Sequence, residues 1–296
     1  MPGVRVLGIP VRVHASLWLF LAALAAWGQL GRGAALAASI LVHELAHGWC
    51  ARRLGVGVYQ VELWPFGGVV RVDEPALLEP AREAAVAVAG PLAHAALALA
   101  AVAARAAKVG GDGPLGGWLQ LWVLDQVALA LFNLLPAYPL DGGRVLRAWL
   151  ASRQGVGRAT GTVVQLGRWM GGAMVVLGWI AYGAGWMSPW AMAMGVLVAY
   201  AAGQQGRRAA SAWVQYLDRL QQAPPASVRE VRALAARYDA PLKEVTARWV
   251  PGRYHLVLVT GPRGELRGLV GERAVVETFL SHGPYARLAQ AGPRSL

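Results

Sequence analysis

His43-Glu44-Leu45-Ala46-His47 lies inside an apolar run, residues 34–54, that is long enough to cross a membrane as a helix. On a helix, histidines four residues apart lie on the same face, so this pair can share one tetrahedral zinc ion. Glu44 lies between them and can act as a general base toward water at that metal. The pattern is short and arises by chance in ordinary helices, so taken alone it leaves metal binding open.

The composition is that of a membrane protein. Of 296 residues, 56% are hydrophobic and only 15% are charged, and the 13 tryptophans are interpreted as anchors at the membrane interface. The formal net charge is +12, but the arginines cluster between apolar runs, and no soluble segment shows a basic face with stacking aromatics. We therefore predict no nucleic-acid partner. The single cysteine, Cys50, excludes an internal disulfide and is interpreted as a packing residue.

Six apolar segments are long enough to span a bilayer, which predicts a mainly α-helical, polytopic membrane protein. They are residues 14–30, 34–54, 82–107, 117–135, 162–183 and 188–205. In a six-span arrangement, most arginines between the segments fall on one side of the membrane. That side holds Arg5, Arg12, Arg52, Arg53, Arg82, Arg144, Arg147, Arg153, Arg158, Arg207 and Arg208, and the other side holds Arg32, Arg105 and Lys108.

This asymmetry predicts a multi-pass protein of the cell membrane with both termini in the cytoplasm. It also places the His43–His47 motif in the cytoplasmic half of its span. The first apolar run follows two arginines and could alternatively be a cleavable signal peptide. We favour a span, because removal of this run would spoil the charge asymmetry.

A β-hairpin is predicted between the second and third spans, over Val56–Glu74, with Gly67 and Gly68 at its turn. Open strand edges cannot face lipid, so the hairpin must lie at the membrane surface or line a protein cavity. It is either a simple connection or a docking edge for an unwound substrate, which needs backbone partners once its own helix has opened.

Catalytic zinc typically takes three protein ligands, and Asp141 is the candidate for the third. It lies in residues 133–144, where two prolines end the fourth span and two glycines follow the carboxylate. An alternative is that Asp141 only caps a short helix after it, residues 145–150. We favour the metal-ligand interpretation, because a carboxylate at the edge of the bilayer core is costly without a partner.

Residues 43–47 and 133–144 together closely resemble the signatures of the site-2 protease family of intramembrane zinc metalloproteases. The resemblance covers residues 1–206. It includes the spacing of the spans, the Phe66-Gly67-Gly68 sequence of the hairpin and a Gly90-Pro91 break in the third span.

The resemblance implies that zinc is held by His43, His47 and Asp141, and that Glu44 activates the attacking water. It also implies that Asn133 lies beside the scissile peptide, where it can help to stabilise the oxyanion. The substrate is then a transmembrane or membrane-associated segment, which must unwind before it is cut near the cytoplasmic face. Such cleavage would release a cytoplasmic domain.

At one position the sequence departs from the family, because His94 stands where the family usually carries a second asparagine. This side chain could contact substrate, bind a metal or simply pack in the core, and we slightly favour substrate contact. With Gly67, Gly68 and Asn133 it completes the predicted substrate-binding set. Asp125, in the middle of the fourth span, is given no chemical role.

The chain changes character after residue 206. Residues 1–206 are the predicted transmembrane protease domain, residues 207–226 a linker, and residues 227–296 a small cytoplasmic α/β domain. The elements predicted in that last domain are a helix near 228–238, strands at 255–260 and 266–270 around a turn at 261–264, and a helix over 272–280.

The order strand, turn, strand, helix over residues 255–280 resembles a single cystathionine-β-synthase-type (CBS) motif. The sporulation-type branch of the site-2 proteases carries such a domain after its spans, which implies adenine-nucleotide binding and processing of a membrane-tethered sigma-factor precursor. These motifs work in pairs, so one copy implies a homodimer or a degenerate domain that only packs. The lipid bilayer and an inhibitory membrane partner complete the expected partners.

Two other classes of protein stay open. A catalytically silent membrane sensor or scaffold would need none of the four residues that the chemistry requires, yet all four are present. A transporter would use Asp125, His94 and the broken helices as an ion path and would not need Glu44. The protease needs Glu44 for turnover, so cleavage by a Glu44→Gln variant separates the classes.

Overall fold

The computed structural model spans residues 1–296 and describes residues 4–65, 67–111, 113–185, 189–222 and 229–292. The chain forms two compact units. The first consists of Met1–Leu77 and Ala81–Leu146, and the second of Leu78–Pro80 and Arg147–Leu296. The histidine motif and its predicted partner Asp141 both belong to the first unit.

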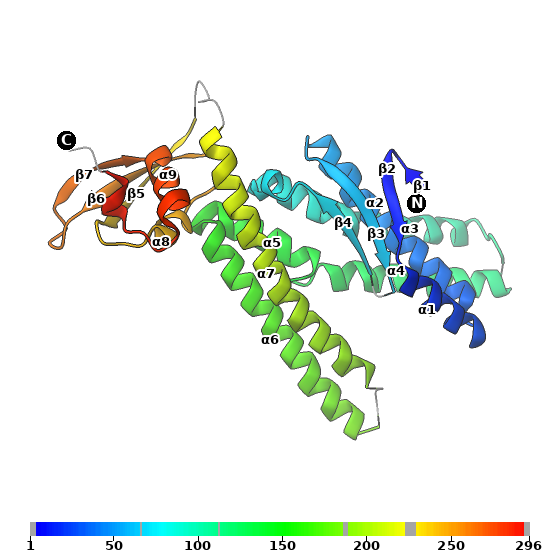
Figure 1. The fold of residues 1–296 in the computed structure, drawn as a ribbon. Coiled ribbons are helices and arrows are strands. Elements are labelled where there is room, and N and C mark those ends of the chain that lie inside the picture. Colours follow the sequence, from blue (N-terminus) through cyan, green and yellow to red (C-terminus); the bar gives the residue numbers. More distant parts are fainter. Residues whose placement is uncertain (1–3, 66, 112, 186–188, 223–228, 293–296) are drawn as a thin grey trace. The chain divides into compact units, whose positions relative to one another are not determined.

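The helices of the first unit lie at the predicted spans (Figure 1). They are α1 (Ala15–Ala26), α2 (Leu30–Arg53), α3 (Pro80–Ala106) and α4 (Pro114–Asn133), and α5 (Asp141–Gln154) begins at the end of this unit. α4 ends before the two prolines, as predicted. The predicted break at Gly90-Pro91 is wrong, because α3 runs through Pro91 without interruption. A long apolar helix tolerates the loss of one N–H donor.

A four-stranded sheet packs on α2. Its strands, in spatial order, are β1 (Val4–Val6), β2 (Ile9–Val13), β3 (Val58–Trp64) and β4 (Gly67–Val72). β3 and β4 form the predicted hairpin, in which Leu63 pairs with Gly68. The apolar side chains of Ile9, Val11 and Val61 form a core with Leu45 of α2, which lies between the two motif histidines. The sheet therefore fixes the position of the motif helix.

The sequence does not predict β1 and β2. β2 pairs in parallel with β3, with Val11 opposite Val61, and β1 pairs antiparallel with β2. Both strands are short, and Pro10, the second residue of β2, has no backbone N–H to donate. The pairing of β2 with a hairpin some fifty residues later is a tertiary contact that a local pattern does not reveal.

Among the described residues, three helices are long and apolar enough to cross a membrane: α3, α4 and α6 (Val156–Gly183). α1 is apolar but has 12 residues, which makes it about 18 Å long and shorter than a hydrocarbon core of about 30 Å. α2 and α7 (Trp190–Gln222) are longer but include charged residues. The membrane character is thus confirmed, and the number of six crossings stays a prediction.

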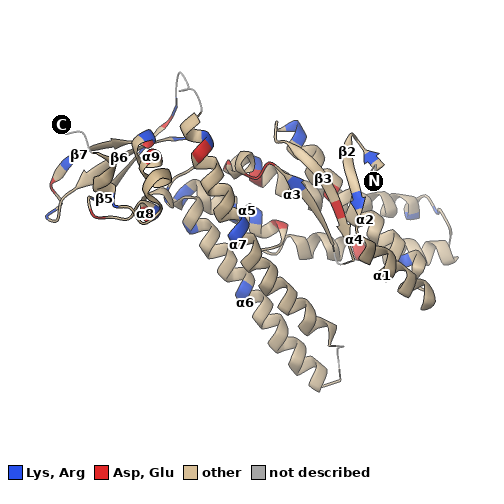
Figure 2. Cartoon of the chain, in the orientation of Figure 1, with Lys and Arg blue, Asp and Glu red and all other residues tan. Residues whose placement is uncertain are grey.

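α6 and α7 form a helical hairpin in the second unit. The end of this hairpin opposite the C-terminal domain carries no charge (Figure 2). Between Arg168 and Arg207 the sequence contains no Asp, Glu, Lys or Arg. Small residues bring the two helices close together, since a Cβ added to Gly171 would lie 2.5 Å from the carbonyl oxygen of Gly195. Such packing of two uncharged helices is typical of a membrane-embedded hairpin.

The C-terminal part of the second unit is an α/β domain around a three-stranded sheet. Its elements are β5 (Val231–Arg237), α8 (Leu242–Thr246), β6 (Tyr254–Thr260), β7 (Leu266–Gly271), α9 (Glu272–His282) and the short 3-10 helix η2 (Leu288–Ala291). β6, β7 and α9 lie where the sequence predicts two strands and a final helix. The likeness of this domain to a CBS motif stays a prediction.

The predicted helix over residues 228–238 is wrong. Residue 228 lies outside the described residues, and residues 231–237 form β5, which pairs in parallel with β6. Alanine and arginine favour a helix here when the segment is considered alone. However, its side chains alternate between exposed and partly buried, and Leu234 and Ala236 pack on the domain core. Tertiary packing overrides the local propensity.

The predicted linker, residues 207–226, begins inside α7. Residues 207–222 form the end of this helix, and residues 223–226 lie outside the described residues. Leu217 of α7 is fully buried in the core of the C-terminal domain, together with Leu242 and Trp249. One helix therefore continues from the uncharged hairpin into the domain core, and a domain boundary at residue 206 stays a prediction.

Candidate active site

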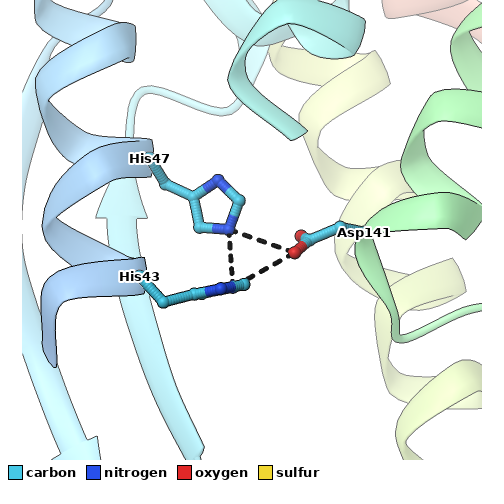
Figure 3. Close-up of side chains that lie close together, drawn as sticks. All are labelled: His43, His47 and Asp141. Carbon is cyan, nitrogen blue, oxygen red and sulfur yellow. Dashed lines mark hydrogen bonds and ion pairs between the residues drawn. The ribbon is translucent and has the colours of Figure 1, made fainter. Parts of the chain in front are cut away.

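His43 and His47 lie one turn apart on the buried face of α2, and Asp141 faces them from the start of α5 (Figure 3). Asp141 Oδ2 lies 3.1 Å from His43 Nε2 and 3.2 Å from His47 Nε2. The two Nε2 atoms are 3.0 Å apart. The structure thus brings the three predicted metal ligands together at one buried point.

These three atoms fit a zinc ion. Ligands about 2.0–2.1 Å from a tetrahedral zinc lie about 3.3 Å from one another, close to the separations of these donor atoms. Asp141 Oδ2 is buried and has no hydrogen-bond partner among the described residues, although both imidazoles touch it. A cation offsets the cost of such a buried carboxylate oxygen. Two imidazoles and a carboxylate are ligands that suit zinc.

The surroundings of His47 and Asp141 favour the forms of these side chains that bind a metal. His47 Nδ1 lies 2.7 Å from the carbonyl oxygen of Val86 in α3. Nδ1 therefore donates its proton there, and Nε2 keeps a free lone pair. Asp141, with Oδ2 facing both imidazole nitrogens, would bind the ion as a carboxylate.

The two glycines after Asp141 bring α5 against the loop that follows α4. A Cβ on Gly142 would lie 2.1 Å from the carbonyl oxygen of Leu134, and one on Gly143 would lie 2.4 Å from the carbonyl carbon of Ala137. These distances leave no room for a side chain at either position. The Asp-Gly-Gly sequence thus holds the carboxylate at the end of the fourth predicted span.

Glu44 is buried beside the predicted metal ligands and touches the hairpin. A Cβ on Gly68 of β4 would lie 2.3 Å from Glu44 Cγ and 2.9 Å from its Oε1. The bare backbone of β4 therefore lies directly against the carboxylate of the predicted general base. Gly67 begins β4 with a φ of 153°, which favours glycine.

Gly90 of α3 lets both imidazoles lie against the backbone of that helix. An added Cβ would lie 2.4 Å from His47 Nε2 and 2.6 Å from His43 Nε2. A side chain at this position would have to displace the same nitrogen atoms that face Asp141. The glycine therefore leaves room for the two imidazoles of the predicted metal site, although it offers no ligand.

Replacing Gly90 by alanine should weaken zinc binding at least about tenfold, because the new methyl group pushes both imidazoles out of position. Zinc affinity would be measured on the purified full chain by competition with a chromogenic chelator. Gly117→Ala is the matched control, since Gly117 is also helical and an added Cβ there meets nothing within 4 Å. Equal zinc affinities for wild type and Gly90→Ala would contradict this role.

His94 lies beside the site, at the end of a buried chain of polar groups. Its ring centroid is 4.8 Å from that of His43. Its Nδ1 lies 2.8 Å from Gln126 Oε1, Gln126 Nε2 donates to Ser39 Oγ at 2.8 Å, and that hydroxyl donates to the carbonyl oxygen of Ala35 at 3.2 Å. The Ser39 hydroxyl donates its proton to Ala35, so it accepts from Gln126 Nε2. Gln126 Oε1 can then only accept, and His94 Nδ1–H donates to it. The chain joins α2, α3 and α4 and sets the tautomer of His94.

Replacing Gln126 by leucine should lower the free energy of unfolding by about 1–3 kcal/mol, because His94 Nδ1 and Ser39 Oγ would lose a buried partner. The expected result is a lower midpoint of thermal unfolding for the detergent-purified protein. Gln165→Leu, at an exposed position of α6, is the control. The hydrogen-bond chain would have no structural role if both variants unfolded at the wild-type midpoint.

Asn133 and Asp125 lie on α4 but have different surroundings. Asn133 donates to the carbonyl oxygen of Leu129 one turn earlier in the helix, at 3.0 Å. Its contact with a substrate therefore stays a prediction. Asp125 forms an ion pair with Arg32 of α2, at 2.8 Å, so this carboxylate has its partner on a neighbouring helix.

Sequence reasoning did not identify Ser39, Gln126 or the packing role of Gly90. The first two are polar residues within predicted spans, and that placement is the signal that could have identified them. The role of Gly90 depends on how closely α3 approaches α2. No local pattern in the sequence shows that distance.

Two histidines and a glutamate on one helix, a carboxylate ligand from another and membrane-type helices in the same fold define a zinc metallopeptidase of membranes. Residues 33–117 match Peptidase family M50. The chain is 34% identical to the zinc metalloprotease Rip3 of Mycobacterium tuberculosis, over 91% of this chain and 73% of that protein. It is 28% identical to the zinc metalloprotease MJ0392 of Methanocaldococcus jannaschii, over 59% of this chain and 52% of that protein.

A solved structure of a site-2 protease from Methanocaldococcus jannaschii is similar to this fold. The TM-score is 0.55 at 26% sequence identity, over 69% of this chain and 93% of that one. The chain belongs to Peptidase family M50, the site-2 protease family. It is an intramembrane zinc metalloendopeptidase, as the paired motifs predict.

Proposed function

We propose that this protease cuts a peptide bond in or next to a transmembrane segment of a membrane-tethered protein, near the cytoplasmic face. The position of the site supports this. His47 lies near the end of α2, which closes with Arg52 and Arg53, and arginines mark the cytoplasmic ends of membrane helices. From His47 to Arg52 the helix rises only about 8 Å, so water can enter from that side.

The substrate is proposed to bind in extended form along β4. This strand is the last in its sheet, so its outer edge pairs with no strand in the part of the chain that the structure describes. Gly68 on the same strand lies against the carboxylate of Glu44. A segment that adds to this edge would bring its backbone carbonyls close to the general base. This contact is the observation that carries the proposal.

Different residues of this chain then have different roles in hydrolysis of the peptide bond. Zinc held by His43, His47 and Asp141 would supply a Lewis acid and lower the pKa of a water molecule there. Glu44 takes the proton from the attacking water and passes it to the nitrogen of the leaving amine. Asn133 and His94 are proposed to hold the opened substrate backbone beside the site.

The finer topology is also a proposal. Six crossings with both termini in the cytoplasm agree with the uncharged stretch between Arg168 and Arg207, which an α6–α7 hairpin would place in the bilayer. The basic residues at the start of α6 and in the second half of α7 would then lie on the cytoplasmic side. In this arrangement the C-terminal domain is cytoplasmic.

The proposed partners follow from the sporulation-type resemblance. A membrane-tethered regulator, such as a sigma-factor precursor, is the proposed natural substrate, and an inhibitory membrane protein is a proposed partner. Homodimer formation and adenine-nucleotide binding are proposed for the C-terminal domain.

The cleavage position can be measured in proteoliposomes that hold the full chain and a single-span reporter with a cytoplasmic fluorescent domain. Mass spectrometry of the released fragment should place the cut in the cytoplasmic third of the span. A reporter with a Gly-Pro pair near the cut should be cleaved faster than one with an all-leucine span, because its helix opens more easily. A cut confined to the outer half of the span would contradict the proposal.

A further inference from the structure

A basic pocket lies in the second unit, where the first turn of α6 meets α8 of the C-terminal domain. Its volume is about 400 Å³. The residues that line it include Arg158, Lys243, Arg248, Glu244 and Tyr285. None of these belongs to the zinc site, which lies in the other unit.

Backbone contacts fix the two walls of this pocket to one another. The N–H of Val156 donates to the carbonyl oxygen of Trp249, and the N–H of Gly157 donates to that of Ala247, each at 3.1 Å. A Cβ on Gly157 would lie 2.7 Å from the Cβ of Ala247, so the helix start is pressed against the domain. The pocket is therefore already formed. These two helix N–H groups are used and cannot bind a ligand, so the basic side chains are the cationic groups that could contact one.

The charge in the pocket favours an anion. Three cationic side chains face one carboxylate, that of Glu244, which leaves a net charge of about +2. In the part of the chain that the structure describes, Arg158, Lys243 and Arg248 have no ion-pair partner. The ammonium of Lys243 lies over the ring of Tyr285, 5.3 Å from its centroid. Guanidinium and ammonium groups gathered in this way are typical partners of phosphate.

The pocket would also lie close to the lipid headgroups if α6 crosses the membrane. α6 can cross a membrane, and the roughly 20 residues that this requires, counted back from Gly183, begin near residue 164. The backbone of Arg158 is then about 9 Å outside the hydrocarbon core, just beyond a headgroup layer of about 5–8 Å, and its long side chain can reach back into that layer. Tyr285 is 74% exposed, and an exposed tyrosine is common at this depth.

We propose that this pocket binds the phosphate headgroup of an anionic phospholipid and thereby holds the C-terminal domain at the membrane surface. The pocket is within side-chain reach of the headgroup layer if α6 crosses the membrane, and basic pockets beside membrane helices on the cytoplasmic side suit such lipids. A soluble phosphate compound has the same chemistry, so the experiment must distinguish the two sources. The proposal depends on α6 crossing the membrane and does not depend on proteolysis.

The test compares retention of phosphatidylglycerol and phosphatidylcholine by the detergent-purified full chain, with native mass spectrometry as the readout. The wild type should hold phosphatidylglycerol at least about tenfold more tightly than phosphatidylcholine. The combined variant Arg158→Gln/Lys243→Gln/Arg248→Gln should lose this preference. The control Arg208→Gln/Arg263→Gln/Arg273→Gln removes the same charge outside the pocket and should keep it.

A variant that binds the lipid more tightly controls for misfolding, because a misfolded protein would bind less. Glu244→Gln removes the one carboxylate of the pocket and should tighten phosphatidylglycerol binding about fivefold, which a damaged fold would not do. The proposal is wrong if the control loses the preference as fully as the pocket variant. It is also wrong if adenosine triphosphate or inorganic phosphate binds through these three residues while phosphatidylglycerol shows no preference.

Discussion

Replacing Glu44 by glutamine should lower the rate of substrate cleavage by about a thousandfold and leave zinc bound. The amide has nearly the same shape as the carboxylate, so it can keep the contact with Gly68. It cannot take a proton from water, and the proposed proton transfer to the leaving amine therefore stops. His43, His47 and Asp141 are unchanged, so the metal stays.

Cleavage of the single-span reporter and zinc content would be measured on the same proteoliposomes. Glu62→Gln is a suitable control, because Glu62 lies on the neighbouring strand β3 and pairs with Arg71 at 3.1 Å. It should cleave at close to the wild-type rate. A Glu44→Gln protein that holds zinc and still cleaves the reporter at the wild-type rate would remove the proposed general base from the mechanism.

Replacing Asp141 by alanine should weaken zinc binding by at least about a hundredfold and abolish cleavage with it. The substitution removes one of three protein ligands and the anionic charge that balances the metal. Both histidines remain in place on α2, so the variant tests the contribution of the second segment of the site. The measurement is zinc per chain after dialysis, by elemental analysis.

Asp125→Ala is the matched control for this variant. Asp125 is also an aspartate in the membrane part of the chain, but it pairs with Arg32 rather than with the histidines. Its loss should leave zinc at the wild-type level. Full zinc retention by Asp141→Ala would exclude Asp141 as a ligand and would leave its contact with the two imidazoles unexplained.

The meeting of His43, His47 and Asp141 could be predicted because each part has a local signature. The spacing of His43 and His47 places them on one face of any helix. Asp141 follows two prolines that end a helix and precedes two glycines, and both features lie in one short segment. The hairpin was predictable for the same reason, since the strands β3 and β4 are adjacent in sequence and joined at Gly67.

The parts that could not be predicted depend on distant contacts. β2 becomes a strand by pairing with β3, and β5 becomes one by pairing with β6, against the helical propensity of its alanines. Gly90 and Gly68 look like ordinary glycines in the sequence. Their importance comes from side chains of α2 that lie within about 3 Å of where a Cβ would be, and only the packing of the helices and the sheet shows this.

The hydrogen bonds that link His94 to Ser39 through Gln126 give a structural reason for the histidine at position 94. Gln126 holds one ring nitrogen, so the orientation of His94 is set by α2 and α4 together. Whether it contacts the substrate stays a prediction. Its neighbour His43 is a proposed metal ligand. The contact between the rings of His94 and His43 connects the buried hydrogen-bond chain to the predicted metal site.

Removal and return of zinc in one membrane preparation tests the central claim most directly. Zinc per chain and reporter cleavage would be followed together while a chelator strips the metal from wild-type protein and zinc is then added back. We expect cleavage to fall to background with the zinc and to return as the content reaches about one ion per chain. Cleavage that continues after the zinc has been removed would contradict a zinc-dependent site at His43, His47 and Asp141.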